Sequence, residues 1–140
     1  MKHIFMDTNI VIDFLANRQP FAMDAAQIFD LAVNGKVKIF IAAVSYNNIY
    51  YILRQSMTGN ATLKLLEELA AITEIADVTD SVIRQSLKTD FKDYEDAIQY
   101  HTALSIPHLD FIVTRNTKDF KKSKLAILNP TEALASLAGI

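Results

Sequence analysis

Segments patterned like short buried strands alternate with segments patterned like helices along the whole chain, and this alternation constrains the fold more than any other feature. Residues 2–6 and 109–114 are short apolar or β-rich runs. Residues 36–42, 74–78 and 125–128 are further candidate strands. Strands separated by helices join into a parallel sheet through right-handed crossovers, with helices on both faces. The pattern predicts an α/β fold: a three-layer α/β/α domain with a central parallel sheet of about five strands.

The segments between these runs carry apolar residues at helical spacing and have recognisable ends. In residues 22–33 the apolar positions recur at intervals of three and four, and Gly35 supplies a stop signal. Pro130 is favoured in the first turn of a helix. We expect helices over residues 10–15, 22–33, 61–72 and 93–105, one capped by Ser45 that runs to about residue 55, one capped by Asp80 that runs to about residue 88, and a last one from Pro130.

Length and composition indicate one compact domain over residues 1–140, without a linker or an internal repeat. The chain is 51% hydrophobic and 21% charged, which excludes a disordered or low-complexity protein. It has no cysteine, so a disulfide framework and a thiolate metal site are both excluded. No apolar run reaches the length of a membrane span or a signal peptide. We expect a cytoplasmic protein with no membrane partner.

The charge distribution is uneven although the total is small. The formal net charge is −2, so no global basic field attracts nucleic acid. Five of the 14 basic residues nevertheless fall within ten positions: Arg115, Lys118, Lys121, Lys122 and Lys124. This run is either a solvated loop or a phosphate-contacting patch, and the sequence favours neither.

Polar residues follow the expected strands where each strand ends. Asp7 comes directly after residues 2–6, and Thr114, Arg115 and Asn116 end the strand near residue 113. In an open parallel sheet, ligands gather beyond the carboxyl ends of the strands. We therefore expect residues 2–6 and 109–113 to be adjacent strands, with Asp7 and Asn116 close together. The alternative for Asp7 is that it only caps the helix after it.

Two further features bring polar side chains into the same argument. Asn48 lies among apolar neighbours in a predicted helix. Asp93 and Asp96 are three residues apart and so share one helix face. Acidic residues in a first helical turn are also favoured by capping and by the helix dipole, so either residue alone has a purely structural explanation.

Four segments in order resemble the motifs of the PIN-domain family, and the resemblance spans nearly the whole chain. They are MDTNIVIDFL, AAVSYNNIYYIL, FKDYEDAIQYHTAL and IVTRNTKDF. The chain looks most like the toxin-like ribonucleases of the virulence-associated protein C type. The usual fold of this family, five parallel strands with flanking helices, agrees with the fold expected above.

The resemblance also implies which residues form the site. Asp7, Asn48, Asp96 and Asn116 take the four catalytic positions, with Asn47 as the fallback for Asn48. The family usually has acids at all four, and two of them are amides here, which weakens metal binding without abolishing it. By the same resemblance and the arguments above, the metal ligands are Asp7, Asp96 and Asp93, the supporting hydrogen-bonding or acidic groups are Thr8, Asn9, Thr114 and Asp119, and the RNA-phosphate contacts are Arg115, Lys118, Lys121 and Lys122.

The implied activity is a Mg²⁺- or Mn²⁺-dependent endoribonuclease that hydrolyses RNA phosphodiester bonds, as the toxin of a type II toxin–antitoxin pair. Its partners are then the RNA substrate and an antitoxin protein. The alternative is a non-catalytic PIN domain that binds RNA or a protein. A phosphatase or phospho-receiver domain is less favoured, because Asp7 lacks the paired acid that either needs after the first strand. Residues 49–53 and 61–72 have more apolar positions than a single core-facing stripe requires, so we also expect a homodimer.

Overall fold

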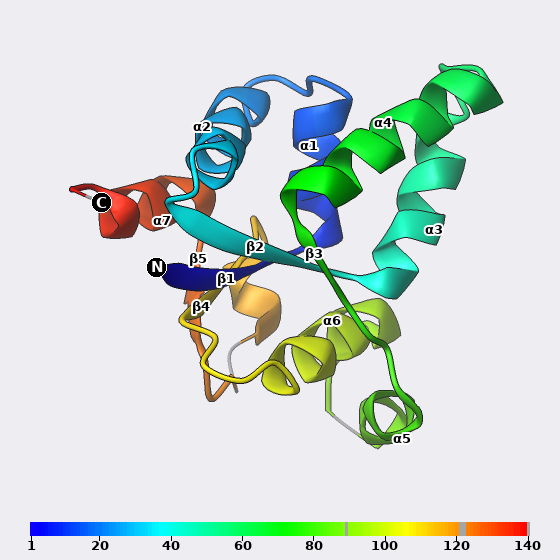
Figure 1. The fold of residues 1–140 in the computed structure, drawn as a ribbon. Coiled ribbons are helices and arrows are strands. Elements are labelled where there is room, and N and C mark those ends of the chain that lie inside the picture. The colour runs from blue at the N-terminus through cyan, green and yellow to red at the C-terminus, as the bar shows by residue number, and fades with distance from the viewer. Residues whose placement is uncertain (89, 121–122, 140) are drawn as a thin grey trace.

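The computed structural model describes residues 1–88, 90–120 and 123–139, and a parallel sheet forms its centre (Figure 1). The sheet has five strands in the order β3-β2-β1-β4-β5, and every neighbouring pair is parallel. The strands are β1 (Lys2–Met6), β2 (Val37–Ala42), β3 (Glu74–Ala76), β4 (Phe111–Val113) and β5 (Ala126–Leu128). This sheet confirms the predicted α/β class.

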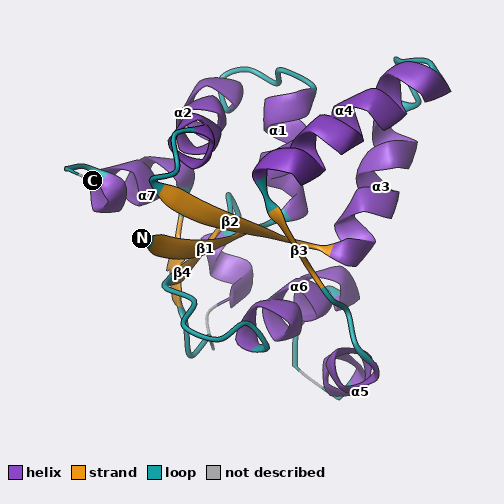
Figure 2. Ribbon diagram, in the orientation of Figure 1, coloured by secondary structure: helices purple, strands orange, loops and turns teal. Residues whose placement is uncertain are grey.

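Helices cover both faces of the sheet and complete the three layers (Figure 2). On one face, buried residues of the strands pack with those of α1 (Thr8–Leu15), α2 (Ala22–Val33), α3 (Ala43–Leu53), α4 (Gly59–Ile72) and α7 (Pro130–Leu137). The other face packs against α6 (Tyr94–Leu104) and the 3₁₀ helix η1 (Thr117–Phe120). The helix α5 (Asp80–Leu87) packs on α6. No helix in the described ranges is long and apolar enough to cross a membrane.

The central strand β1 is apolar at successive positions because both of its faces are buried. Ile4 and Met6 are buried in the core under α1 and α2, whereas Phe5 is buried in the core under α6. A parallel sheet covered on both faces needs apolar side chains in both directions. The apolar run that predicted this strand is therefore the expected signature of a central one.

The ends of α2 and α7 agree with their sequence signals. Gly35 adopts a φ of +71°, its N–H donates to the Ala32 carbonyl, and the N–H of Lys36 donates to the Leu31 carbonyl. This paired arrangement is a Schellman motif, which favours glycine at the left-handed position. At α7, Pro130 occupies the first turn after the capping residue Asn129.

Three other predicted helix starts were wrong by one or more residues. Ser45 does not cap α3, which begins at Ala43; its side chain is fully buried inside the helix instead. Thr79 caps α5 in place of Asp80, and Thr58 caps α4, which begins at Gly59. Helix ends are the least determined part of a helical pattern and commonly differ by one or two residues.

The chain changes direction across the sheet at β1, and this places the site. The strands β2 and β3 lie on one side of β1, whereas β4 and β5 lie on the other. The register pairs Met6 with Val113, and the N–H of Asp7 donates to the Val113 carbonyl at 3.0 Å. The predicted adjacency of β1 and β4 is confirmed. Such a switch point is where open α/β sheets hold their ligands.

Candidate active site at the sheet switch point

Asp7, Thr114 and Asn116 form a hydrogen-bonded chain beyond β1 and β4. Thr114 Oγ1 donates to Asp7 Oδ2 at 2.8 Å, and the Asn116 N–H donates to Thr114 Oγ1 at 3.1 Å. Asp7 occupies the N-cap position of α1, but its carboxylate makes no capping hydrogen bond. Only 4% of Asp7 is exposed. Capping therefore does not explain why an acid is buried at this position.

Asp96 brings the second carboxylate to this point from the first turn of α6. Burial, together with the negative charges of Asp7, Asp93, Asp119 and Glu95, raises the pKa of Asp96 to about 7. Burial also raises the pKa of Asp7 to about 6, although the hydrogen bond from Thr114 opposes this shift. These charge effects place the acids within electrostatic range of Asp96. A cation bound there would relieve the repulsion between their charges.

Asn48 reaches the cluster through Glu95, a residue that the sequence argument did not assign to the site. Asn48 Nδ2 on α3 donates to Glu95 Oε1 on α6 at 3.0 Å. The charge of Glu95 also acts on both Asp7 and Asp96. The sequence signal that could have identified Glu95 is the amide of Asn48, because an amide N–H₂ group among apolar neighbours requires a hydrogen-bond acceptor.

Asp93 and Asp119 lie at the exposed rim of the cluster. Asp93 Oδ1 accepts a hydrogen bond from the Glu95 N–H at 2.8 Å, so this residue does cap α6. Asp119 lies in η1, and its N–H donates to the Asn116 carbonyl at 3.0 Å. This turn folds Asp119 back so that its charge reaches Asp96.

Thr8 and Asn9 begin α1 directly after Asp7. Thr8 Oγ1 is hydrogen-bonded to Ser45 Oγ at 2.7 Å, and Gln99 Nε2 donates to Ser45 Oγ at 3.0 Å. Asn9 is half-buried in the first turn of the same helix. Ser45 and Gln99 were not predicted to belong to the site, because one was interpreted as a helix cap and the other carries no motif signal.

Arg115 is held by other side chains of the protein. Its Nε lies 2.7 Å from Asp13 Oδ2, its terminal nitrogen donates to Asp13 Oδ1 at 3.2 Å, and its guanidinium lies 4.1 Å from the Phe21 ring centroid. Burial raises the pKa of Asp13, and the Arg115 charge opposes that shift. The predicted phosphate contact of Arg115 stays a prediction. Lys118 is exposed in η1, and Lys121 and Lys122 lie outside the described residues.

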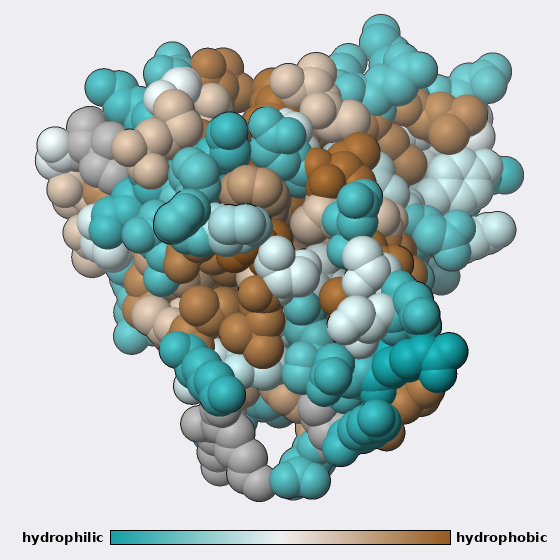
Figure 3. Space-filling model, turned by 60° about the horizontal axis from the view of Figure 1, so that its bottom comes forward, coloured by the Kyte–Doolittle hydropathy of each residue, from teal (hydrophilic) through white to brown (hydrophobic). Residues whose placement is uncertain are grey.

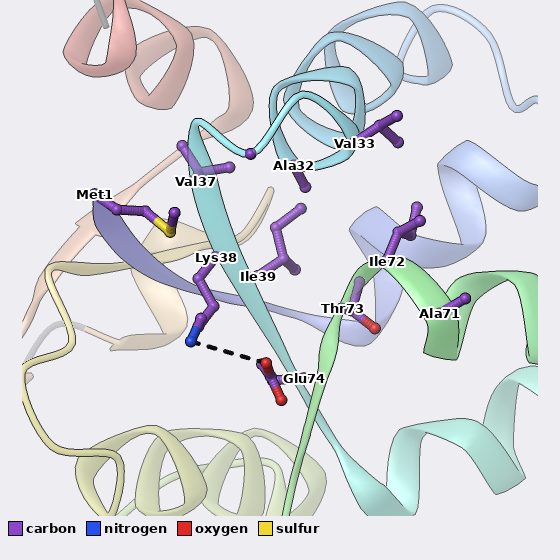
Figure 4. Close-up of a pocket in the computed structure, with 11 residues that line it drawn as sticks. Met1, Ala32, Val33, Val37, Lys38, Ile39, Ala71, Ile72, Thr73 and Glu74 are labelled. Carbon is purple, nitrogen blue, oxygen red and sulfur yellow. Dashed lines mark ion pairs between the residues drawn. The ribbon is translucent and has the colours of Figure 1, made fainter.

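A separate pocket of about 290 Å³ lies at the opposite edge of the sheet (Figure 4). Met1, Val37 and Glu74 line it at the amino ends of β1, β2 and β3, together with the mostly apolar ends of α2 and α4. Lys38 and Glu74 form an ion pair at 3.8 Å along one wall. Because the acids follow the carboxyl ends of the strands, this pocket is not part of the candidate active site.

The residues present fit a hydrated divalent cation better than a closed metal cage. Within the described ranges, no three Asp, Glu, His or Cys side chains are arranged to hold a metal ion by themselves. Mg²⁺ keeps several of its waters and requires only one or two protein carboxylates. Asp7 and Asp96 provide two, both with pKa values raised as expected for acids that lack a cation.

The fold and the acidic switch point define a class: a parallel α/β domain with its candidate site beyond the central strands. A family model described as PIN domain matches residues 3–118. The chain belongs to the PIN-domain family, as its four motifs indicated. No curated protein matches the sequence.

Several solved structures are similar to this chain over most of its length. VapBC-1 from nontypeable Haemophilus influenzae aligns with a TM-score of 0.69 at 18% identity, over 92% of this chain and 98% of that chain. VapBC2 from Rickettsia felis, bound to a promoter DNA fragment, gives 0.66 at 19% identity, over 91% and 97%. A toxin–antitoxin complex from Klebsiella pneumoniae gives 0.64 at 23%, over 91% and 97%. At these identities the similarity establishes the fold.

Proposed function

We propose that this PIN domain is a Mg²⁺- or Mn²⁺-dependent endoribonuclease. The observation that carries the proposal is the convergence of Asp7 and Asp96, from two different elements, at the switch point of the sheet. Burial and neighbouring negative charge disfavour ionisation of both carboxyl groups, and a cation would favour it. Bound there, a divalent ion lowers the pKa of water and stabilises the charge of a phosphodiester transition state.

The side chains around the proposed site have separable roles. Asp7 and Asp96 hold the cation, and Thr114 orients Asp7 through the 2.8 Å hydrogen bond. Glu95 and Asp119 add negative charge that the amides at positions 48 and 116 do not supply. Asp93, exposed at the rim with one oxygen fixed by the Glu95 N–H, accepts the proton of the attacking water. Lys118 and the basic residues that follow it attract the RNA backbone.

We further propose that the protein is the toxin of a type II toxin–antitoxin pair. The solved structures with the same fold come from complexes described as VapBC or toxin–antitoxin. An antitoxin would then be the protein partner. A short, partly disordered protein encoded immediately upstream would support this role, and relief of growth arrest on co-expression would test it.

A non-catalytic PIN domain that binds RNA or a protein is the second candidate. The amides Asn48 and Asn116 favour it, because the family usually has acids there and an amide adds no charge to a cation site. Under this alternative, RNA binding persists without cleavage and weakens steeply as salt rises.

Cleavage of a labelled RNA with and without metal distinguishes the two candidates. The nuclease requires added Mg²⁺ or Mn²⁺, loses activity with chelator, and loses orders of magnitude when Asp7→Asn removes a carboxylate that holds the cation. Glu68→Gln removes an exposed carboxylate on α4 and serves as the control with unchanged activity. If the wild-type protein binds RNA but cleaves none with any divalent metal, the non-catalytic function replaces the proposed one.

A further inference from the structure

Three buried polar side chains connect the elements that carry the acidic site. Ser45 Oγ on α3 lies 2.7 Å from Thr8 Oγ1 on α1 and accepts a hydrogen bond from Gln99 Nε2 on α6 at 3.0 Å. The exposed fractions of Thr8, Ser45 and Gln99 are 5%, 0% and 1%. We call these three side chains the polar relay. It joins three helices through one hydroxyl group.

Each member of the polar relay stands at a fixed distance along the chain from a residue of the site. Thr8 directly follows Asp7. Ser45 precedes Asn48 by three residues on α3, and Gln99 follows Asp96 by three residues on α6. Positions three apart lie on one face of a helix. A shift of α6 along α3 that moved Asp96 would therefore also break the bond between Gln99 and Ser45.

Stability alone does not account for a polar relay at this place. A buried hydrogen bond contributes only about 1 kcal/mol net, and apolar groups of the same shape are often equally stable. Gln99 Oε1 is buried and finds no hydrogen-bond donor among the residues that the structure describes. A relay that leaves one acceptor unsatisfied stabilises the core less than hydrocarbon would. What it adds is a defined register between helices that hydrocarbon would leave adjustable.

We propose that the polar relay is a positioning device that fixes Asp7 and Asp96 relative to each other and thereby sets the affinity for a divalent cation. The inference rests on the proposed metal-dependent function. Ser45 is its central residue, because a hydroxyl has one donor and two acceptor sites and can serve both neighbours at once. None of the three side chains needs to contact the cation for this role.

Gln99→Met is the decisive substitution, because methionine has a similar length and flexibility but no hydrogen-bonding amide. We expect a thermal midpoint equal to or above that of the wild type, together with roughly 10-fold weaker Mn²⁺ binding by calorimetry, the usual effect of losing a group that supports a metal ligand. Thr62→Val is the matched control. It removes a hydroxyl of a fully buried residue that donates to the carbonyl of Thr58, the cap of α4, far along the chain from the acids, so the midpoint falls and Mn²⁺ affinity stays unchanged.

Thr8→Val tests the same device from its other end. It removes one hydroxyl and keeps the side-chain shape, so Mn²⁺ affinity falls while the fold persists. If the relay acts as a unit, Thr8→Val adds little to the loss already caused by Gln99→Met, whereas independent effects would multiply. This pair also keeps the test open if one variant folds poorly.

The outcomes separate failure of the inference from failure of the function beneath it. Wild-type binding of Mn²⁺ with unaltered binding by both Gln99→Met and Thr8→Val would overturn the positioning role alone. Parallel losses of midpoint and affinity in Gln99→Met, matched by the Thr62→Val control, would also reduce the relay to a structural feature. A wild-type protein that binds no divalent metal would contradict the proposed function and the inference together.

Discussion

Asp7 and Asp96 lower the stability of the folded protein at neutral pH. Burial and the charges of neighbouring acids, Glu95 in both cases, hold the pKa of each carboxyl group well above its usual value. A carboxyl group that titrates late in the folded state resists ionisation, and this resistance is lost stability at neutral pH. Acids kept in such surroundings are characteristic of functional sites.

The metal-free protein should therefore become less stable as pH rises from about 4 to about 7, and its stability should then level off. Because the folded pKa values of Asp7 and Asp96, about 6 and about 7, exceed the unfolded value of 3.8, the favourable contribution of each group is fully present below pH 3.8 and is lost as pH rises through its folded pKa. Asp96→Asn should raise the free energy of unfolding at pH 8 by about 1 to 2 kcal/mol, after allowance for the partial exposure of Asp96. Urea denaturation with chelator measures it.

The comparison at each pH removes the contribution of His101. Burial lowers the pKa of His101, so its effect on stability runs in the opposite direction and appears as the pH falls. Wild type and Asp96→Asn share this term. Equal pH dependence of the two proteins would show that Asp96 carries no excess repulsion.

Glu95 and Asn48 permit a sharper test of where the site obtains its charge. Glu95→Gln should weaken Mn²⁺ binding, because it removes a negative charge that acts on both Asp7 and Asp96. Asn48→Glu alone places a second acid within hydrogen-bond distance of Glu95, so repulsion limits any gain. The double variant Asn48→Glu with Glu95→Gln keeps one negative charge in this pair, and the amide at position 95 then donates to the carboxylate at position 48.

Calorimetry on these variants decides the matter. We expect the wild type and the exchange variant to bind Mn²⁺ with similar affinity, and Glu95→Gln to bind it much more weakly than either. Glu68→Gln, which changes the same charge on α4, should bind like the wild type. Unchanged affinity of Glu95→Gln would remove Glu95 from the site.

At the scale of elements, the sequence predicted the strands and helix ends that depend on local residues, and it missed the features that depend on tertiary packing. The strands β1 and β4 and the ends of α2 and α7 follow from apolar runs, Gly35 and Pro130, each with a local cause. Ser45 was assigned as a cap because its residue type favours caps, but it lies within α3 and is hydrogen-bonded to residues of two other helices, α1 and α6. Only the three-dimensional arrangement distinguishes a capping serine from a buried one.

The clamp between α1 and the loop after β4 is another such element-scale feature. The Asp13 side chain is fully buried, and Arg115 pairs with it while stacking on Phe21. Asp13→Ala leaves the Arg115 charge without its partner, and we expect a loss of about 3 kcal/mol in the free energy of unfolding. Asp80→Asn removes an exposed pair with Arg84 on α5 and should change it by less than about 1 kcal/mol. Similar losses for both variants in urea denaturation would contradict the buried clamp.

At the scale of the whole molecule, the order of motifs predicted the family and the fold, which no single residue could do. Asp7, Asp96 and Asn116 were expected together; the pairing of β1 with β4 brings the segments of Asp7 and Asn116 together, and the charge of Asp7 reaches Asp96 on α6. Glu95 was overlooked because it lies beside two other acids in one helical turn, and the sequence alone does not distinguish which of them contacts α3. The bond from Asn48 on α3 supplies that information.

Apolar surface beyond the needs of the core predicts that two copies of the chain associate. Tyr51 on α3 and Leu63 on α4 are 64% and 52% exposed, and they flank the connection between these helices. Figure 3 shows brown apolar areas between hydrophilic ones on the face at the bottom of Figure 1 as well. More than one surface exposes apolar groups, so substitutions on each surface are needed to identify the dimer interface.

We expect the isolated protein to be a homodimer at micromolar concentration in multi-angle light scattering. Replacing Tyr51 and Leu63 by serine should shift it to monomer, because both substitutions remove exposed apolar area that association would bury. Leu87→Ser, which changes a 68% exposed side chain on α5, should leave the dimer intact. A wild-type monomer at every concentration would contradict the homodimer. Loss of antitoxin binding in the Tyr51 and Leu63 variant would then show that this surface is reserved for the partner protein.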